Sequence, residues 1–167
     1  MPKQALWKTV TGLSGLEGHW LRAKHFTPAV LEQLAARIAE SERDHTGELV
    51  LAIEAVSPLH EPDSHVRALE VFGRLRVWDT PLNTGVLLYL ALDRHHIQIV
   101  ADRGATVSNT DWERICVQLE HDFRQKRYAQ GLEAAIDAIE QLLLTHTPAV
   151  PEGGVDTDDL PNWPVML

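Results

Sequence analysis

Residues 86–101 read VLLYLALDRHHIQIVA, and this stretch decides the fold. Two apolar runs, 86–92 and 97–101, are separated by four polar residues that end in an adjacent pair of histidines. Apolar runs of this length with a short polar link are typical of two strands joined as a β-hairpin. The sequence therefore predicts an antiparallel pair of strands, with both histidines on the surface of the turn.

The rest of the core is predicted outward from this hairpin. Residues 48–56, ELVLAIEAV, are apolar on both faces in the middle, as in a strand that helices cover on both sides. Helical spacing predicts four helices, opened in order by Thr27-Pro28, by Ser64, by a capping box of Thr110 and Glu113, and near Ala129. A helix between 48–56 and 86–92 makes these two strands parallel. The predicted fold is α/β, a three-layer α/β/α sandwich around a small mixed β-sheet.

The chain divides into three parts. Residues 1–24 contain Gly12, Gly15 and Gly18 and are interpreted as an N-terminal arm. Residues 25–147 form the α/β domain, and 148–167 form an acidic Pro/Gly-rich C-terminal tail. Two states of this tail stay open at this point: a mobile tail whose deletion leaves the domain folded, or a strap held in a groove by Trp163, Val165 and Leu167.

Composition excludes several classes of protein. The 167 residues carry a formal net charge of −9 with scattered basic residues, which argues against a nucleic-acid partner. The single cysteine, Cys116, forms no internal disulfide and falls on an apolar helical stripe, so it is predicted to be a small core residue. No apolar run approaches the roughly 20 residues that span a bilayer. A cytoplasmic protein without a membrane span is expected.

Several short strings resemble the TPM domain family over roughly residues 25–146. These strings are HTGE at 45–48, NTGVLL at 83–88 and IVADRG at 99–104. Two more, RVWDT at 76–80 and DLPNWPV at 159–165, resemble a bacterial subgroup made without signal peptide or membrane anchor. Thr84 stands where the family usually has a second Asn.

The resemblance implies a range of functions. Some members of the family are described as phosphatases and others as binders of divalent cations. Bacterial members often accompany a membrane protein of the LemA family, which implies a LemA-like protein partner at the inner face of the membrane.

Oxygen-bearing side chains around the predicted sheet form the most attractive candidate site. Asp79 and Asn83 precede the strand at 86–92, Asp102 follows the strand at 97–101, and Asp111 begins a helix. If these loops meet at one edge, their oxygens suit Ca²⁺ or Mg²⁺. The alternative makes Asp79 and Asn83 turn residues, Asp102 an acceptor for loop amides and Asp111 a helix-start acid.

Three further residues, Glu54, Arg67 and Arg103, are candidates for a chemical role. Glu54, on the face of the strand at 48–56, is either an acid–base carboxylate or the ion-pair partner of Arg67. Arg103 is either an anion contact or a solvated loop arginine. The sequence contains no phosphate loop, nucleophile elbow or dinucleotide fingerprint. The leading hypothesis is a protein-interaction module with divalent-cation binding at the acidic loops, and the alternative is a weak metal-dependent phosphatase at the same loops.

Overall fold

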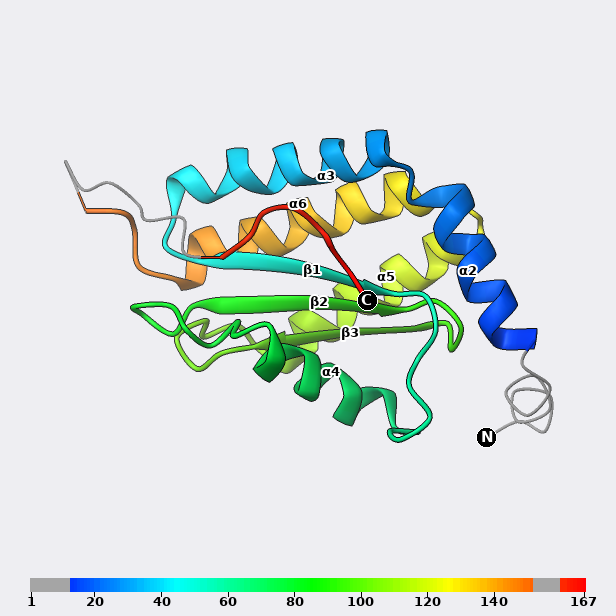
Figure 1. The fold of residues 1–167 in the computed structure, drawn as a ribbon. Coiled ribbons are helices and arrows are strands. Elements are labelled where there is room, and N and C mark those ends of the chain that lie inside the picture. The colour runs from blue at the N-terminus through cyan, green and yellow to red at the C-terminus, as the bar shows by residue number, and fades with distance from the viewer. Residues whose placement is uncertain (1–12, 152–159) are drawn as a thin grey trace.

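A mixed sheet lies between two layers of helices in the computed structural model, which describes residues 13–151 and 160–167 (Figure 1). Its strands are β1 (Glu48–Glu54), β2 (Gly85–Ala91), β3 (His96–Ala101) and β4 (Val165–Met166), and their order within the described residues is β3-β2-β1-β4. β1 pairs in parallel with β2 and β4, and β2 pairs antiparallel with β3. The predicted α/β fold with a mixed sheet is confirmed.

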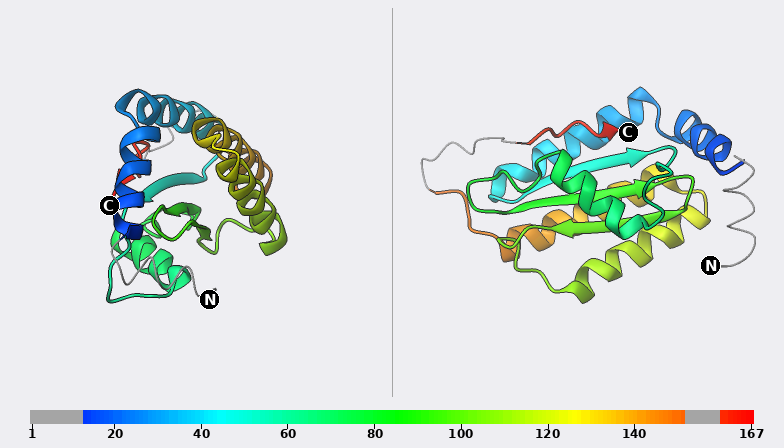
Figure 2. Two further views of the ribbon diagram at one scale, coloured as in Figure 1. Left: turned by 90° about the vertical axis from the view of Figure 1, so that its right-hand side faces the viewer. Right: turned by 60° about the horizontal axis from the view of Figure 1, so that its bottom comes forward.

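Helices cover both faces of the two central strands, which explains why every residue of β1 and β2 is buried. One face packs against α3 (Pro28–Ser41), α5 (Asn109–Arg124) and α6 (Tyr128–His146). The other face packs against α4 (Ser64–Arg74) and the C-terminal segment (Figure 2). The alternation of side chains along a strand sends Leu51 to the first core and Val50 to the second.

A further helix, α2 (Leu13–His25), occupies part of the segment interpreted from sequence as an arm, and residues 1–12 of that arm lie outside the described chain. α2 crosses the end of the sheet at the carboxyl ends of β1 and β2 (Figure 1). A Cβ at Gly18 would lie 1.8 Å from the carbonyl oxygen of Ala55. The glycine that lowered the helix propensity is therefore the residue that lets this helix pack closely against the end of β1.

Two helices begin with caps that differ from the predicted ones. Asp63, rather than Ser64, caps α4 by accepting from the amides of His65 and Val66 at 2.8 and 3.2 Å. Ser108, rather than Thr110, caps α5 by accepting from the amide of Asp111 at 3.2 Å. In both cases an equally good capping residue stands one or two positions earlier and reaches the first free amides.

The end of the C-terminal segment docks on the sheet as β4. The amide of Leu167 donates to the carbonyl of Ile53 at 2.9 Å, and Val165 lies opposite Ala52 in the strand pair. Leu160 is buried in the same core as Ala68 and Val71 of α4, whereas Trp163 is half exposed. Of the two states left open by the sequence, the structure shows the docked one for residues 160–167, with Val165 and Leu167 against β1.

Candidate functional site

The structure brings Asn83 and Asp102 together at one edge of the sheet. β2 begins and β3 ends at this edge because the two strands are antiparallel (Figure 1). The amide of Asp102 donates to the carbonyl of Gly85 at 2.9 Å, and the amide of Gly104 donates to the carbonyl of Asn83 at 2.7 Å. Asn83 has a φ of 56°, a left-handed conformation that asparagine tolerates well. Backbone hydrogen bonds therefore hold the two loops against each other.

The carboxylate of Asp102 is only half satisfied. Its Oδ1 accepts from the amide of Arg103 at 2.7 Å. Its Oδ2 is buried and has no hydrogen-bond partner within the described residues. A buried carboxylate oxygen without a donor is costly, and a hard cation would supply the missing interaction.

Asp79 and Asp111 have interactions of their own. Asp79 forms an ion pair with Arg76 at 2.7 Å, and both side chains are largely exposed. Asp111 accepts from the Ser108 hydroxyl at 2.6 Å and pairs with Arg114 at 3.0 Å, so its contacts belong to the first turn of α5.

No group of three or more His, Cys, Asp or Glu side chains among the described residues is arranged to hold a metal ion. A cation at this edge would therefore depend on Asp102, the Asn83 amide oxygen and backbone carbonyls. Gly104 allows the two loops to approach closely, because a Cβ there would lie 2.1 Å from the carbonyl oxygen of Leu82.

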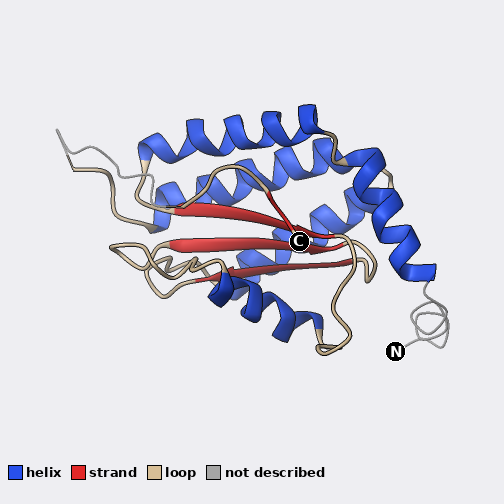
Figure 3. Ribbon diagram, in the orientation of Figure 1, coloured by secondary structure: helices blue, strands red, loops and turns tan. Residues whose placement is uncertain are grey.

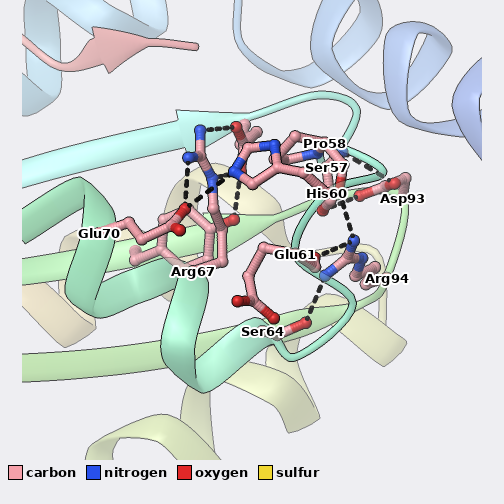
Figure 4. A network of polar contacts seen from close by, with 11 residues as sticks. Ser57, Pro58, His60, Glu61, Ser64, Arg67, Glu70, Asp93 and Arg94 are labelled. Atoms are coloured by element: carbon pink, nitrogen blue, oxygen red, sulfur yellow. Dashed lines mark hydrogen bonds and ion pairs between the residues drawn. The ribbon is translucent and has the colours of Figure 1, made fainter.

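A buried ion pair lies at the opposite edge, where β1 ends (Figure 4). Arg67 of α4 donates from Nη2 to Glu54 Oε1 at 2.7 Å and from Nε to Glu54 Oε2 at 3.1 Å. The hydroxyl of Tyr89 also donates to Glu54 Oε2. The two charged side chains are only 8% and 4% exposed. The predicted pairing of Glu54 with Arg67 is confirmed.

This environment favours a structural ion pair over acid–base chemistry. The bond to Glu54 holds the pKa of Arg67 above its ordinary value. Burial, followed by the bond to Glu54, raises the pKa of Tyr89. Arg67 also donates to Glu70 at 3.0 Å, and Glu70 lies 3.3 Å from a nitrogen of His60 (Figure 4). The carboxylate of Glu54 thus accepts hydrogen bonds from two side chains, those of Arg67 and Tyr89.

The polar link of the hairpin also has a structural role (Figure 4). Asp93 accepts from both the amide and the hydroxyl of Ser57, at 3.0 and 2.7 Å. Arg94 donates to the carbonyls of Pro58 and Glu61 at 3.2 and 2.8 Å. These two side chains fix the loop that leaves β1.

The prediction that both hairpin histidines are surface residues is only half right. His95 is exposed. His96 is the first residue of β3 and is partly buried, and burial lowers its pKa.

His45 and Glu140 form a buried pair that the sequence analysis missed. Nδ1 of His45 accepts from the amide of Gly47 at 3.1 Å, so Nε2 carries the proton and donates to Glu140 Oε2 at 2.7 Å. Burial raises the pKa of Glu140. The sequence feature that could have indicated this pair is Glu140 itself, a glutamate within the apolar stripe of the last helix. The pair joins α6 to the segment before β1, and His45 is the first residue of the string HTGE.

Cys116 packs against the core, although it is partly rather than fully buried. Burial raises the pKa of its thiol to about 11. We therefore expect slow labelling of the native protein by a thiol reagent at pH 8, and faster labelling as the pH approaches 11, because the thiolate is the reactive form. Cys116→Ala should cost about 1 kcal/mol of unfolding free energy. Labelling at pH 8 as fast as that of a small free thiol would contradict this environment.

Comparisons with known proteins identify a family and a solved structure of similar fold. A model of the TPM domain matches residues 22–142. The NMR structure of the BA42 protein from the psychrophilic bacterium Bizionia argentinensis superposes with a TM-score of 0.73 at 27% sequence identity. That match covers 84% of this chain and 94% of the BA42 chain. No curated protein sequence matches significantly. Among the described residues, no helix is both long and apolar enough to cross a membrane.

Proposed function

The chain belongs to the TPM domain family, and we propose that it is a binding module that takes up a divalent cation at Asn83 and Asp102 and contacts a protein partner at the same edge of the sheet. The observation that carries the proposal is the buried Oδ2 of Asp102, which has no hydrogen-bond donor within the described residues. A cation at this oxygen would relieve the cost of its burial.

Exposed apolar side chains adjoin this edge and support the partner contact. Trp78 and Leu82 lie in the loop that leads to Asn83, and they are 47% and 46% exposed. Exposed aromatic anchors of this kind often carry the binding energy of protein interfaces. A LemA-like membrane protein is the partner that the family resemblance implies, and a place in the cytoplasm at the inner face of the membrane is part of the proposal. The cytoplasmic segment of the LemA-like protein should bind this chain. Trp78→Ala should weaken that binding when the two are titrated against each other.

Adding Ca²⁺ or Mg²⁺ is expected to raise the melting temperature of the protein. At an ion concentration about a hundredfold above its dissociation constant, binding adds about 2.7 kcal/mol of stability. Asp102→Asn should abolish most of this shift because it replaces the buried carboxylate. The measurement is a thermal melt of both proteins over a series of ion concentrations.

Two controls separate a specific site from general screening of charge. Asp111→Asn removes one carboxylate whose contacts lie within the first turn of α5, so it should leave the shift unchanged. Sodium chloride at matched ionic strength should not reproduce the shift, since screening acts on exposed charges in general. Equal shifts with sodium and calcium, in the wild type and both variants, would remove the cation from the proposal.

A second candidate function is weak metal-dependent hydrolysis of a phosphoester. Arg103 Nη2 donates to Asn83 Oδ1 at 3.5 Å, so a guanidinium stands at the amide oxygen that would face the proposed cation. A cation and an arginine together can neutralise the oxygens of a phosphoryl group. Release of phosphate from p-nitrophenyl phosphate that requires metal, and that is lost in Asp102→Asn and reduced in Arg103→Gln, would favour the enzyme. Cation binding without such turnover would favour the binding module.

A further inference from the structure

A pocket of about 350 Å³ opens at the edge of the sheet opposite to the Asn83–Asp102 loops. It lies where the end of β2 and the start of β3 meet α2, the last turn of α5 and the first turn of α6. Figure 1 shows these elements together at the end of the molecule that α2 crosses. Its volume is that of sites for small molecules, and open α/β sheets bind ligands beyond the carboxyl ends of their parallel strands.

The inner walls of the pocket are apolar and rigid. Leu90 lies in β2, Leu92 directly follows that strand, and Ile97 comes from β3. Each of these side chains is almost completely buried. Tyr128 stacks on His25 with ring centroids 4.1 Å apart and contacts Phe123 at 4.7 Å. These contacts fix two aromatic rings of the lining in place, so a flat apolar group would find a preformed surface.

The mouth of the pocket is basic, in contrast to the net charge of −9 for the whole chain. Arg124 and Lys126 both line it and both are exposed. Glu120 offsets one of these charges through its ion pair with Arg124 at 3.0 Å. Lys126 has no ion pair within the described part of the chain. Burial first, and then the charges of Lys24 and Lys126, lower the pKa of His25, which stacks on the pocket residue Tyr128.

We propose that this pocket binds a small aromatic carboxylate, with its ring between the β2–β3 hairpin and Tyr128 and its carboxylate toward Lys126 and Arg124. This ligand site is distinct from the edge that carries the proposed cation. The apolar walls select the ring, and the cations at the mouth select the negative charge. A neutral analogue of the same shape would keep the first contribution and lose the second.

Phenylacetate and phenylacetamide, two probes that differ in the negative charge, test the site in the full chain. We expect phenylacetate to shift the amide signals of Leu92, Ile97 and Phe123 in a nitrogen–proton NMR titration, while those of Asn83 and Asp102 stay in place. Phenylacetamide should bind about fivefold more weakly, and phenylacetate should bind Lys126→Gln about fivefold more weakly than wild type, as for an exposed ion pair.

Arg103→Gln removes the same charge at the opposite edge and is the matched control, with unchanged affinity for phenylacetate expected. The comparison of the two probes uses the wild-type protein, and both variants change only an exposed side chain. Neither result therefore depends on a damaged fold. The proposal would be overturned if phenylacetate and phenylacetamide bound with equal affinity, or if Lys126→Gln and Arg103→Gln weakened binding equally. It would also be overturned if the pocket signals did not shift up to about 10 mM phenylacetate, because a dissociation constant above that concentration is too weak for a specific site. Failure of the cation test at Asp102 leaves this one untouched.

Discussion

Replacing Arg67 by methionine is expected to lower the free energy of unfolding by about 3–5 kcal/mol, the usual cost of removing one partner of a buried ion pair. Methionine fills much the same volume but leaves the hydroxyl of Tyr89 as the one remaining hydrogen-bond donor to the carboxylate of Glu54 within the described residues. Glu54 is only 4% exposed, so water cannot replace the guanidinium. Urea denaturation of wild type and variant at neutral pH measures the difference.

Two further variants show whether the cost comes from the unpaired charge. The double variant Arg67→Met with Glu54→Gln should recover much of the loss, because no buried charge then remains. Arg37→Met breaks an ion pair with Asp137 whose side chains are 39% and 50% exposed, and it should cost less than about 1 kcal/mol. Similar losses in Arg67→Met and Arg37→Met would mean that burial of the Glu54–Arg67 pair has no special weight.

Leu160→Ala is expected to lower the free energy of unfolding by about 2–3 kcal/mol, at the lower end of the range for buried leucines. Leu160 is 8% exposed and packs in the same core as Val71 and Leu87, although it lies far from them in the sequence. Its truncation removes apolar contact and leaves a cavity in this core. The change should appear as a lower midpoint in urea, with an unchanged slope if the denatured state is unaffected.

Trp163→Ala is the matched control in the same segment. The larger side chain is 50% exposed, so its truncation should cost no more than about 0.5 kcal/mol. A mobile segment would make both substitutions neutral. A loss in Trp163→Ala larger than that in Leu160→Ala would instead restore the sequence-based alternative in which the tryptophan anchors the tail.

The candidate site was partly visible in the sequence. Asn83 and Asp102 flank the two antiparallel strands at the same edge, so the hairpin pattern alone places them near each other. Asp79 and Asp111 carry suitable oxygen ligands, but Arg76 and Ser108 lie close to them in the sequence and form their contacts. The sequence does not show which carboxylate will find a nearby cation or hydroxyl, since rotamers and loop geometry decide it.

Local patterns determined the helices and strands of the core. Apolar residues that recur every two residues lie on one face of a strand, and those that recur every 3.6 residues lie on one face of a helix. The apolar runs in residues 48–56 and 86–101 therefore indicated strands, and because residues 48–56 are apolar on both faces, helices were expected on either side of the sheet. Tertiary structure decided what such patterns cannot encode. Gly18 is needed in α2 because a side chain there would collide with the carbonyl of Ala55, which is distant in the sequence. The Pro-rich end of the chain becomes β4 because β1 offers a free edge with an apolar core on each face of the sheet. Both outcomes depend on contacts between residues far apart in the sequence. These contacts stabilise the protein only once the rest of the fold has formed.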